Sequence, residues 1–246
     1  MNELKAITDY MARNDLMSFA PAAALIDMDG TLYDSMPHHV DAWYRLMTER
    51  GVNCTHDEFF MYEGRTGVST INLLFNREFH HDASPEEAAA LYKKKTVYFS
   101  EMPPVDVMPG AKRMIETLQK KHIATVLVTG SGQNTLLNRL ESDFPGAFPE
   151  NMRITSRDVK HGKPNPEPFL KAMQLVGLYP ENCIAIDNAP LGVMAGAASG
   201  AFTIGVKTGP IPEEALREAG ADIVYSSMNE LADNLHILLN PLTHSI

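Results

Sequence analysis

The sequence of 246 residues has few cysteines and no long apolar run. Its two cysteines, Cys54 and Cys183, lie far apart, and Cys183 stands within the apolar run NCIAI. This placement predicts a reduced, buried thiol rather than a disulfide framework. The first twenty residues lack the apolar centre of a signal peptide, and no stretch approaches membrane-spanning length. We therefore expect a soluble cytoplasmic protein with no membrane partner.

Basic charge is scarce as well. The chain carries 31 Asp and Glu residues against 21 Lys and Arg residues, its formal net charge is -10, and its longest basic run is 93–95. Proteins that bind nucleic acid or anionic membranes present basic patches. The composition thus predicts no nucleic-acid partner, and an anionic substrate must be held by a few local groups. We expect a monomer.

Short apolar runs alternate along the chain with longer segments of helical period. With 44% hydrophobic residues the chain can bury a sizeable core. The predicted strands are 24–28, 123–128, 152–155, 183–186, 202–206 and 223–225. The predicted helical segments between them are 109–121, 133–143, 165–177, 191–200 and 211–220. This alternation is typical of an α/β fold in which helices cover both faces of a Rossmann-like parallel sheet.

One interval interrupts this alternation. Between Ser35 and about Val107 the sequence has no convincing strand but several helical stretches, and one of them opens with the capping-box pattern of Ser84, Pro85 and Glu87. We interpret the interval as an inserted helical domain, called the cap below. The predicted parts are a helical N-terminal extension at residues 1–20, a core formed by 21–34 and 108–246, and the cap at 35–107.

Two like charges stand close together after the first predicted strand. Asp27 and Asp29 end that apolar run, and Gly30 follows them. Residues i and i+2 of an extended chain point the same way, so the two carboxylates repel unless something cationic lies between them. A calcium loop counted from Asp27 fails, because Thr31 and Leu32 stand where an acid and a glycine belong. A magnesium site remains, with one carboxylate as ligand and nucleophile and the other handling a proton.

The segment DMDGTLYDS, residues 27–35, resembles the first motif of the haloacid dehalogenase superfamily, in its phosphatase and phosphomutase branch. Three more segments resemble the later motifs in the family's order: VLVTGSG, HGKPNPEPF and IAIDNAPLGVMAGAASG. Each motif alone is weak, but four in order at predicted strand ends are specific. The resemblance covers 24–206 and implies a Rossmann-like core with an α-helical cap, close to the β-phosphoglucomutase-like branch.

The resemblance also implies the chemistry. Asp27 would attack phosphorus and form an aspartyl phosphate, and Asp29 would protonate the leaving group and then deprotonate the attacking water. Mg²⁺, Thr129 and Lys163 would neutralise the phosphoryl oxygens. Backbone N–H groups would hold the phosphoryl group, and the residues implied for this role are Gly30, Gly130, Ser131 and Gly132.

The fourth motif departs from the family pattern. With Gly192 as the anchor, the usual acidic pair falls on Asp187 and Asn188, so an amide stands where a second carboxylate is expected. The best candidate to restore that charge is Glu63, in the cap segment YEGRTGVST. The predicted metal ligands are therefore Asp27, Asp29, Asp187, Asn188 and Glu63.

The substrate is predicted from the cap. His39 and Arg65 are candidates to contact it, although an exposed cap turn is the alternative for Arg65 and for Glu63. The mutase pattern places an arginine where this chain has Thr70. We therefore expect a Mg²⁺-dependent phosphohydrolase of a small phosphorylated metabolite, such as pyrophosphate or a small sugar or polyol phosphate. A β-phosphoglucomutase-type phosphomutase and a non-catalytic phosphate-binding protein remain the alternatives.

Overall fold

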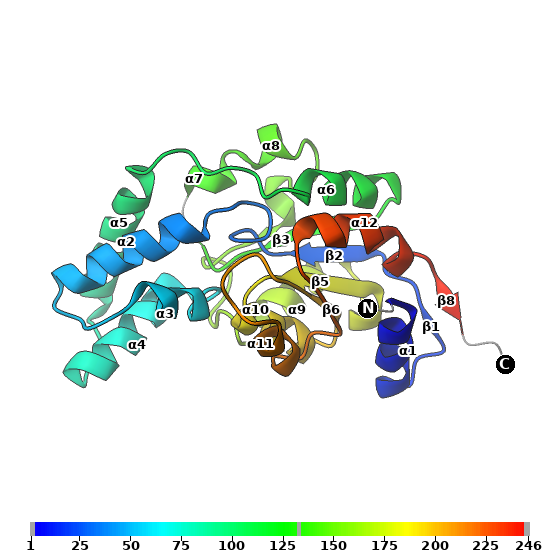
Figure 1. Ribbon diagram of the computed structural model, residues 1–246, viewed down its shortest axis with the longest axis horizontal. Coiled ribbons are helices and arrows are strands. Elements are labelled where there is room, and N and C mark those ends of the chain that lie inside the picture. Colours follow the sequence, from blue (N-terminus) through cyan, green and yellow to red (C-terminus); the bar gives the residue numbers. More distant parts are fainter. Residues whose placement is uncertain (1–2, 132–133, 244–246) are drawn as a thin grey trace.

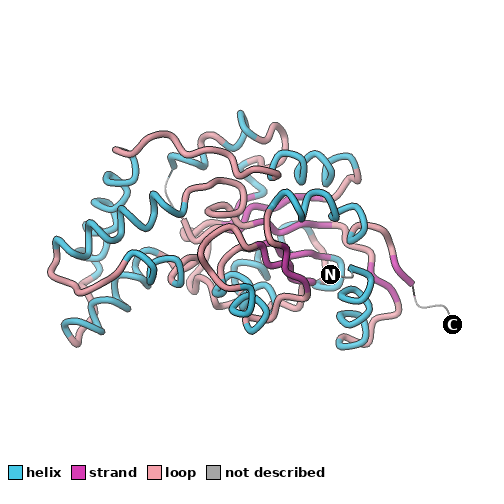
Figure 2. Tube along the Cα trace, in the orientation of Figure 1, coloured by secondary structure: helices cyan, strands magenta, loops and turns pink. Residues whose placement is uncertain are grey.

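The core of the protein is a parallel sheet of six strands. The computed structural model describes residues 3–131 and 134–243. The strands lie in the order β4-β3-β2-β5-β6-β7, and every neighbouring pair is parallel (Figure 1, Figure 2). Their bounds are β2 (Ala23–Ile26), β3 (Ala124–Val128), β4 (Arg153–Ile154), β5 (Cys183–Asp187), β6 (Phe202–Val206) and β7 (Ile223–Tyr225). These are the six predicted strands, so the predicted α/β fold is confirmed.

Helices cover both faces of this sheet. Along β2, Ala24 and Ile26 face one apolar cluster while Ala23 and Leu25 face another, because successive side chains of a strand point to opposite faces. The helices of the first cluster are α1 (Glu3–Arg13), α6 (Ala111–Lys120) and α12 (Met228–Leu238). Those of the other face are α9 (Glu167–Val176), α10 (Pro190–Ala198) and, towards β7, α11 (Glu213–Glu218). Both faces of the central strand are therefore buried, as its purely apolar sequence requires.

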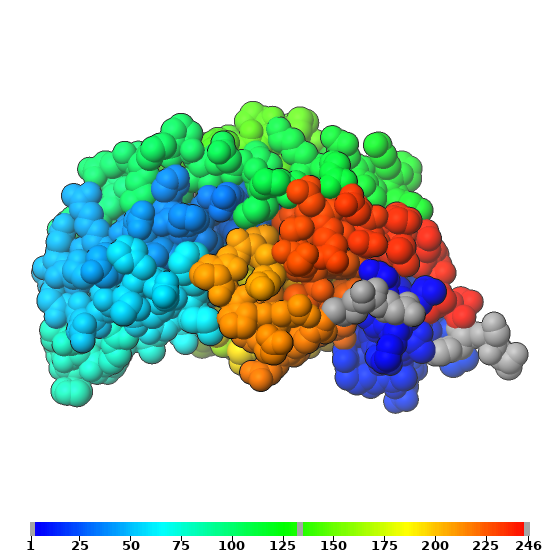
Figure 3. All heavy atoms as spheres, viewed as in Figure 1, coloured from blue at the N-terminus to red at the C-terminus, as the bar shows by residue number. Residues whose placement is uncertain are grey.

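The cap consists of helices inserted between β2 and α6. They are α2 (Met36–Glu49), α3 (His56–Met61), α4 (Gly67–Phe79) and α5 (Pro85–Ser100). The Ser84 hydroxyl accepts a hydrogen bond from the Glu87 N–H, and Pro85 is the first residue of α5, as its sequence predicts. The cap lies at one end of the molecule, beside the core (Figure 1, Figure 3). Within the described ranges, no helix is long and apolar enough to cross a bilayer.

The N-terminal segment is built into the core. In α1 the Tyr10 ring packs edge-on against Phe19 and Phe202, and the Tyr10 hydroxyl donates to the carbonyl oxygen of Gly200 at 2.8 Å. The chain then forms β1 (Ser18–Phe19), which pairs antiparallel with β8 (Leu242–Thr243) near the C-terminus. This small sheet is absent from the sequence prediction, since a two-residue strand leaves no periodic signal. Helix α12 was not predicted either, although its buried residues recur with helical period.

The helix predicted over 133–143 is wrong in one respect. The structure has two short helices there, α7 (Asn134–Leu137) and α8 (Leu140–Asp143). The Arg139 N–H bonds to the carbonyl oxygen of Leu136, three residues back, and this tighter turn ends α7. Two short 3₁₀ helices, Glu150–Met152 and Pro180–Asn182, lead into β4 and β5.

Candidate active site

The candidate site lies where three adjacent strands end. Asp27 follows β2, Thr129 follows β3 and Asp187 ends β5, and these strands are hydrogen-bonded neighbours. Parallel strands end at one edge of a sheet, so residues more than a hundred positions apart meet there. Asp27 and Asp29 are both buried. Gly30 completes the turn with φ +77°, and a Cβ atom on it would lie 2.1 Å from the Asn188 amide nitrogen, so only glycine fits.

Lys163 connects two of the carboxylates. Its Nζ lies 2.5 Å from Asp27 Oδ1 and 2.7 Å from Asp187 Oδ2, and it also donates to the Val128 carbonyl oxygen at 3.0 Å. Burial alone would lower the pKa of this amine, but the two carboxylates outweigh burial and hold the pKa above its usual value. Lys163 is therefore a fixed positive charge beside Asp27.

Asp187 uses both of its carboxylate oxygens in this arrangement. Its Oδ2 contacts Lys163, and its Oδ1 accepts the Ala189 N–H at 3.0 Å. A Cβ atom on Gly192 would lie 2.0 Å from the Asp187 carboxylate, which explains the glycine at the anchor position of the fourth motif. Both oxygens of Asp187 thus already have partners, and its main effect is to position Lys163.

Asp27 differs from Asp187 in the pairing of its carboxylate oxygens. Its Oδ2 is buried and has no hydrogen-bond partner among the described residues. Burial raises the Asp27 pKa to about 8, with Asp187 and Asp29 adding to the shift and Lys163 opposing it. A bound cation would lower this pKa and pair the free oxygen. The Asp27 carboxylate is therefore suited to act both as a metal ligand and as a nucleophile.

Asp29 is held by a different set of partners. Its Oδ1 accepts a hydrogen bond from the Ser35 hydroxyl at 2.7 Å and lies 2.8 Å from His39 Nε2. Burial would raise the Asp29 pKa, but the contacts with His39 and Ser35 outweigh burial and lower it. The predicted site residue His39 therefore contacts the second aspartate directly.

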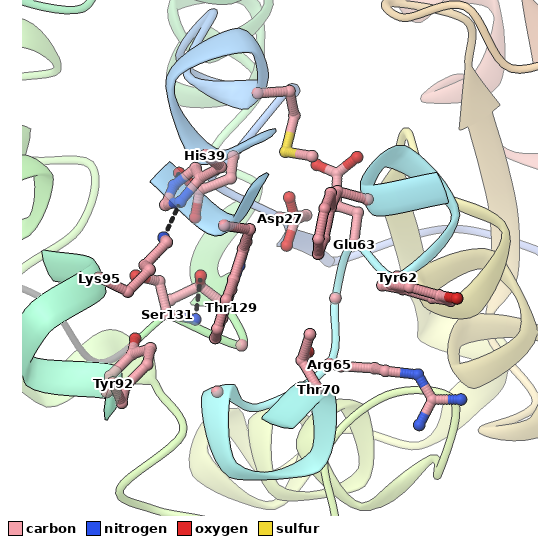
Figure 4. A pocket seen from close by; sticks show the side chains of 17 residues that line it. Asp27, His39, Tyr62, Glu63, Arg65, Thr70, Tyr92, Lys95, Thr129 and Ser131 are labelled. Atoms are coloured by element: carbon pink, nitrogen blue, oxygen red, sulfur yellow. Dashed lines mark hydrogen bonds and ion pairs between the residues drawn. The ribbon is translucent and has the colours of Figure 1, made fainter. Parts of the chain in front are cut away.

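Lys95 extends this chain of contacts into the cap and is a residue that the sequence analysis missed. Its Nζ contacts His39 Nδ1, and it is only 2% exposed (Figure 4). Burial lowers its pKa to about 7, although Asp29 opposes the shift. The run 93–95 resembles a solvated face, yet Lys95 shares the helical face of the buried Leu91 and Phe99, at i-4 and i+4. That spacing is the signal from which it could have been found.

Glu63 enters the site from the cap. The Asn188 Nδ2 lies 3.1 Å from each Glu63 carboxylate oxygen, and Asn188 Oδ1 accepts a hydrogen bond from Thr31 at 3.1 Å. Glu63 is buried, and burial, followed by the charges of Asp27 and Asp187, raises its pKa well above the usual value. The structure thus brings together the amide of the fourth motif and the cap carboxylate. Among the described residues, no three His, Cys, Asp or Glu side chains are preassembled as a metal-binding group.

The remaining predicted residues divide into two groups. The Thr129 hydroxyl accepts the Ser131 N–H at 3.0 Å, and both line the cavity together with Gly130. Gly132 lies outside the described residues. Arg65 borders the same cavity, but its guanidinium donates to the Ser69 hydroxyl at 3.0 Å and is directed away from Asp27 (Figure 4).

The cavity itself is small, and most of its lining residues come from the cap. It holds about 60 Å³ between Asp27, Asp29, Thr129 and the cap residues. Aromatic rings form much of its wall, and they are Trp43, Phe59, Tyr62 and Tyr92. Lys95 supplies an amine on the cap side of the cavity. The arrangement suits a compact substrate with an anionic or hydroxylic group facing the cap.

Comparison with known proteins gives consistent matches. The profile of the haloacid dehalogenase-like hydrolases matches residues 21–200. Hexitol phosphatase A of Escherichia coli is 27% identical over 208 residues, which is 84% of this chain and 91% of that protein. Beta-phosphoglucomutase of Bacillus subtilis is 26% identical over 221 residues, 85% of this chain and 91% of that protein. A solved Bacteroides vulgatus structure, provisionally named a beta-phosphoglucomutase, has a TM-score of 0.92 and 42% identity over 96% of each chain.

Proposed function

Because this chain belongs to the haloacid dehalogenase-like hydrolase family, we propose that it is a Mg²⁺-dependent phosphohydrolase of a small phosphorylated metabolite that works through an aspartyl phosphate. The family match confirms the predicted resemblance and that the chain is an enzyme of the phosphatase type. The observation that carries the finer proposal is the contact of Glu63 with Asn188, beside the unpaired Oδ2 of Asp27. It supports a cation site completed from the cap.

The charges of the site fit a divalent cation. Four carboxylates, those of Asp27, Asp29, Asp187 and Glu63, lie close together here, and Lys163 is paired directly with two of them, Asp27 and Asp187. Hard cations prefer oxygen ligands, and an amide oxygen serves as one. Asp27, Asn188 and Glu63 would hold Mg²⁺, which would neutralise phosphoryl oxygens during transfer. Asp29 and Asp187 remain predicted as further ligands, because hydrogen-bond partners do not distinguish them from Asn188 and Glu63, whose oxygens also have partners in this structure.

The reaction follows from the positions of the two first-motif aspartates. The Asp27 oxygen forms a bond to phosphorus as the bond to the leaving oxygen breaks, and that oxygen takes a proton from Asp29, which must first be protonated because its contacts lower its pKa in this structure. Asp29 then takes a proton from water as the water oxygen attacks phosphorus, and the bond to Asp27 breaks to release phosphate. Lys163 and the backbone N–H groups after Thr129 hold the transferring oxygens. His39 and Lys95 keep Asp29 in place and supply a proton path towards the cap.

The cavity favours a compact leaving group. Glu63 fills space beside the catalytic aspartates, and the free volume is about 60 Å³. We therefore favour pyrophosphate or a small sugar or polyol phosphate, with Lys95 facing the charge or hydroxyl of the leaving group. A screen of phosphate release over pyrophosphate, polyol phosphates and hexose phosphates, with and without Mg²⁺, tests the proposal. Release that does not depend on Mg²⁺, or that is restricted to bulky substrates, would contradict it.

A phosphomutase is the second candidate, because beta-phosphoglucomutases are among the similar proteins. A mutase must hold a second phosphate, yet Thr70 is the buried cavity residue where the mutase pattern has an arginine. The guanidinium of Arg65 is directed elsewhere. Formation of glucose 6-phosphate from β-glucose 1-phosphate, at a rate above phosphate release, would favour the mutase.

A further inference from the structure

A second cavity lies at the junction of cap and core, and Arg65 borders both it and the active cavity. It is an open groove of about 600 Å³. From the cap it is lined by Arg65, Thr66 and Ser69, and from the core by the loop 160–166 and by Met194 of α10. No part of the reaction described above uses this groove.

The groove is basic in an acidic protein. None of its described lining residues is Asp or Glu, whereas the chain as a whole carries a net charge of -10. Arg65, Lys160 and His161 line it, while Lys163 turns its amine towards Asp27. Glu167 follows the 160–166 loop, but its carboxylate oxygens accept the N–H groups of Lys160 and His161, each at 2.9 Å. The side chains that face the groove are therefore cationic or neutral.

The Arg65 guanidinium has donor capacity left over. Its Nη1 donates to Ser69, and its Nη2 has no acceptor among the described residues. A charged oxygen acceptor is the group that pairs best with a guanidinium. The groove also contains the first turn of α4, a helix of 13 residues whose N-terminal end adds positive potential. The Arg65 guanidinium, the N-terminal end of α4 and the Lys160 amine all favour an anionic ligand.

We propose that this junction groove binds a tetrahedral oxyanion such as inorganic phosphate, held by Arg65 and Ser69 of the cap and by Lys160 and His161 of the core. Because its ligands come from both parts, the bound anion favours the closed arrangement of cap on core. Glu63 lies two residues before Arg65, so closure keeps it in the active cavity. The link to Glu63 rests on the proposed function, whereas anion binding in the groove does not.

Two methionines allow the two cavities to be observed separately. Met194 lines the junction groove and Met36 lines the active cavity. Protein labelled with ¹³C at the methionine methyl groups is titrated with inorganic phosphate at constant ionic strength, and the two signals are assigned with Met194→Leu and Met36→Leu. We expect a saturable shift of the Met194 signal, with a dissociation constant different from that at Met36. Failure of the proposed function would appear at Met36 and in turnover, and would leave the Met194 response unchanged.

Variants decide whether the groove binds the anion. Lys160→Ala removes one exposed charge and should weaken phosphate binding at Met194 about two- to fivefold, and Arg65→Ala should weaken it about tenfold or more. Arg65→Lys should retain part of the affinity, and Lys120→Ala is the control that removes an equal charge outside the groove. A Met194 shift that does not saturate, or that Lys160→Ala and Arg65→Ala leave unchanged, would overturn the proposal.

Discussion

Replacing Lys95 with methionine should stabilise the protein below neutral pH and reduce its activity. Burial lowers the Lys95 pKa from 10.5 to about 7, a difference of 10.5 - 7, about 3.5 units. Each unit corresponds to about 1.36 kcal/mol, so the charged amine costs the folded state about 5 kcal/mol at pH 6. Methionine has a similar length and carries no charge, so Lys95→Met removes this cost.

The pH dependence identifies the cause. Between about pH 7 and pH 10.5 the unfolded chain binds more protons at Lys95 than the folded protein does, so wild-type stability rises with pH in that window. The stability gained by Lys95→Met should therefore be largest below about pH 7 and shrink by about 1.4 kcal/mol per pH unit above it. Lys95 also lies over the Trp43 and Phe99 rings, each at 5.3 Å. These contacts attract only the charged amine, so their loss lowers the stability gain of Lys95→Met below about pH 7, where Lys95 is protonated, and not at higher pH.

Urea unfolding of wild type and variant from pH 6 to pH 10 measures this difference. Lys94→Met is the matched control, because Lys94 is the exposed neighbour on the same helix and pairs with Glu49. Phosphate release by Lys95→Met should fall, since His39 loses its partner at Nδ1 and Asp29 is held less firmly. A difference in unfolding free energy that stays constant across this pH range would refute the assignment of Lys95 as a buried, titrating amine.

Four further predictions concern the two first-motif aspartates, the cap contact and the N-terminal helix. Asp27→Asn should abolish phosphate release with little change in melting temperature. Asp29→Asn should lose more activity with substrates that have poor leaving groups than with a nitrophenyl phosphate, whose leaving group needs no proton. Equal losses with both kinds of substrate would show that Asp29 is not the acid. In Gly162→Ala the new Cβ would lie 2.7 Å from the Thr66 methyl carbon, so cap closure should be hindered and KM should rise, and unchanged steady-state kinetics would contradict this. Tyr10→Phe removes the donor to a main-chain carbonyl at 2.8 Å and should cost about 1 kcal/mol in urea unfolding, whereas no loss would show that the bond is not stabilising.

The sheet and the first-motif residues could be predicted because they depend on local patterns. Apolar runs mark the strands, and the motif residues follow them directly, so placing Asp27, Thr129 and Asp187 at one edge needs only the rule for parallel strands. Lys95 was not predicted because it stands in a run of three lysines that resembles a solvated face, although its spacing from Leu91 and Phe99 marks a buried one. The direction of the Arg65 guanidinium also depends on tertiary contacts, here the Ser69 hydroxyl, which no sequence period encodes.

The Mg²⁺ dependence of Glu63→Gln tests the central claim most directly. The claim is that this cap carboxylate restores the charge that Asn188 lacks and completes the cation site. Phosphate release from the best small substrate is measured over a range of Mg²⁺ concentrations, with Glu58→Gln as a control from the same part of the cap, where Glu58 pairs with Arg77. We predict that Glu63→Gln raises the half-saturating Mg²⁺ concentration about tenfold or more and lowers kcat, while the control stays near wild type. Wild-type values of both parameters in Glu63→Gln would contradict the account.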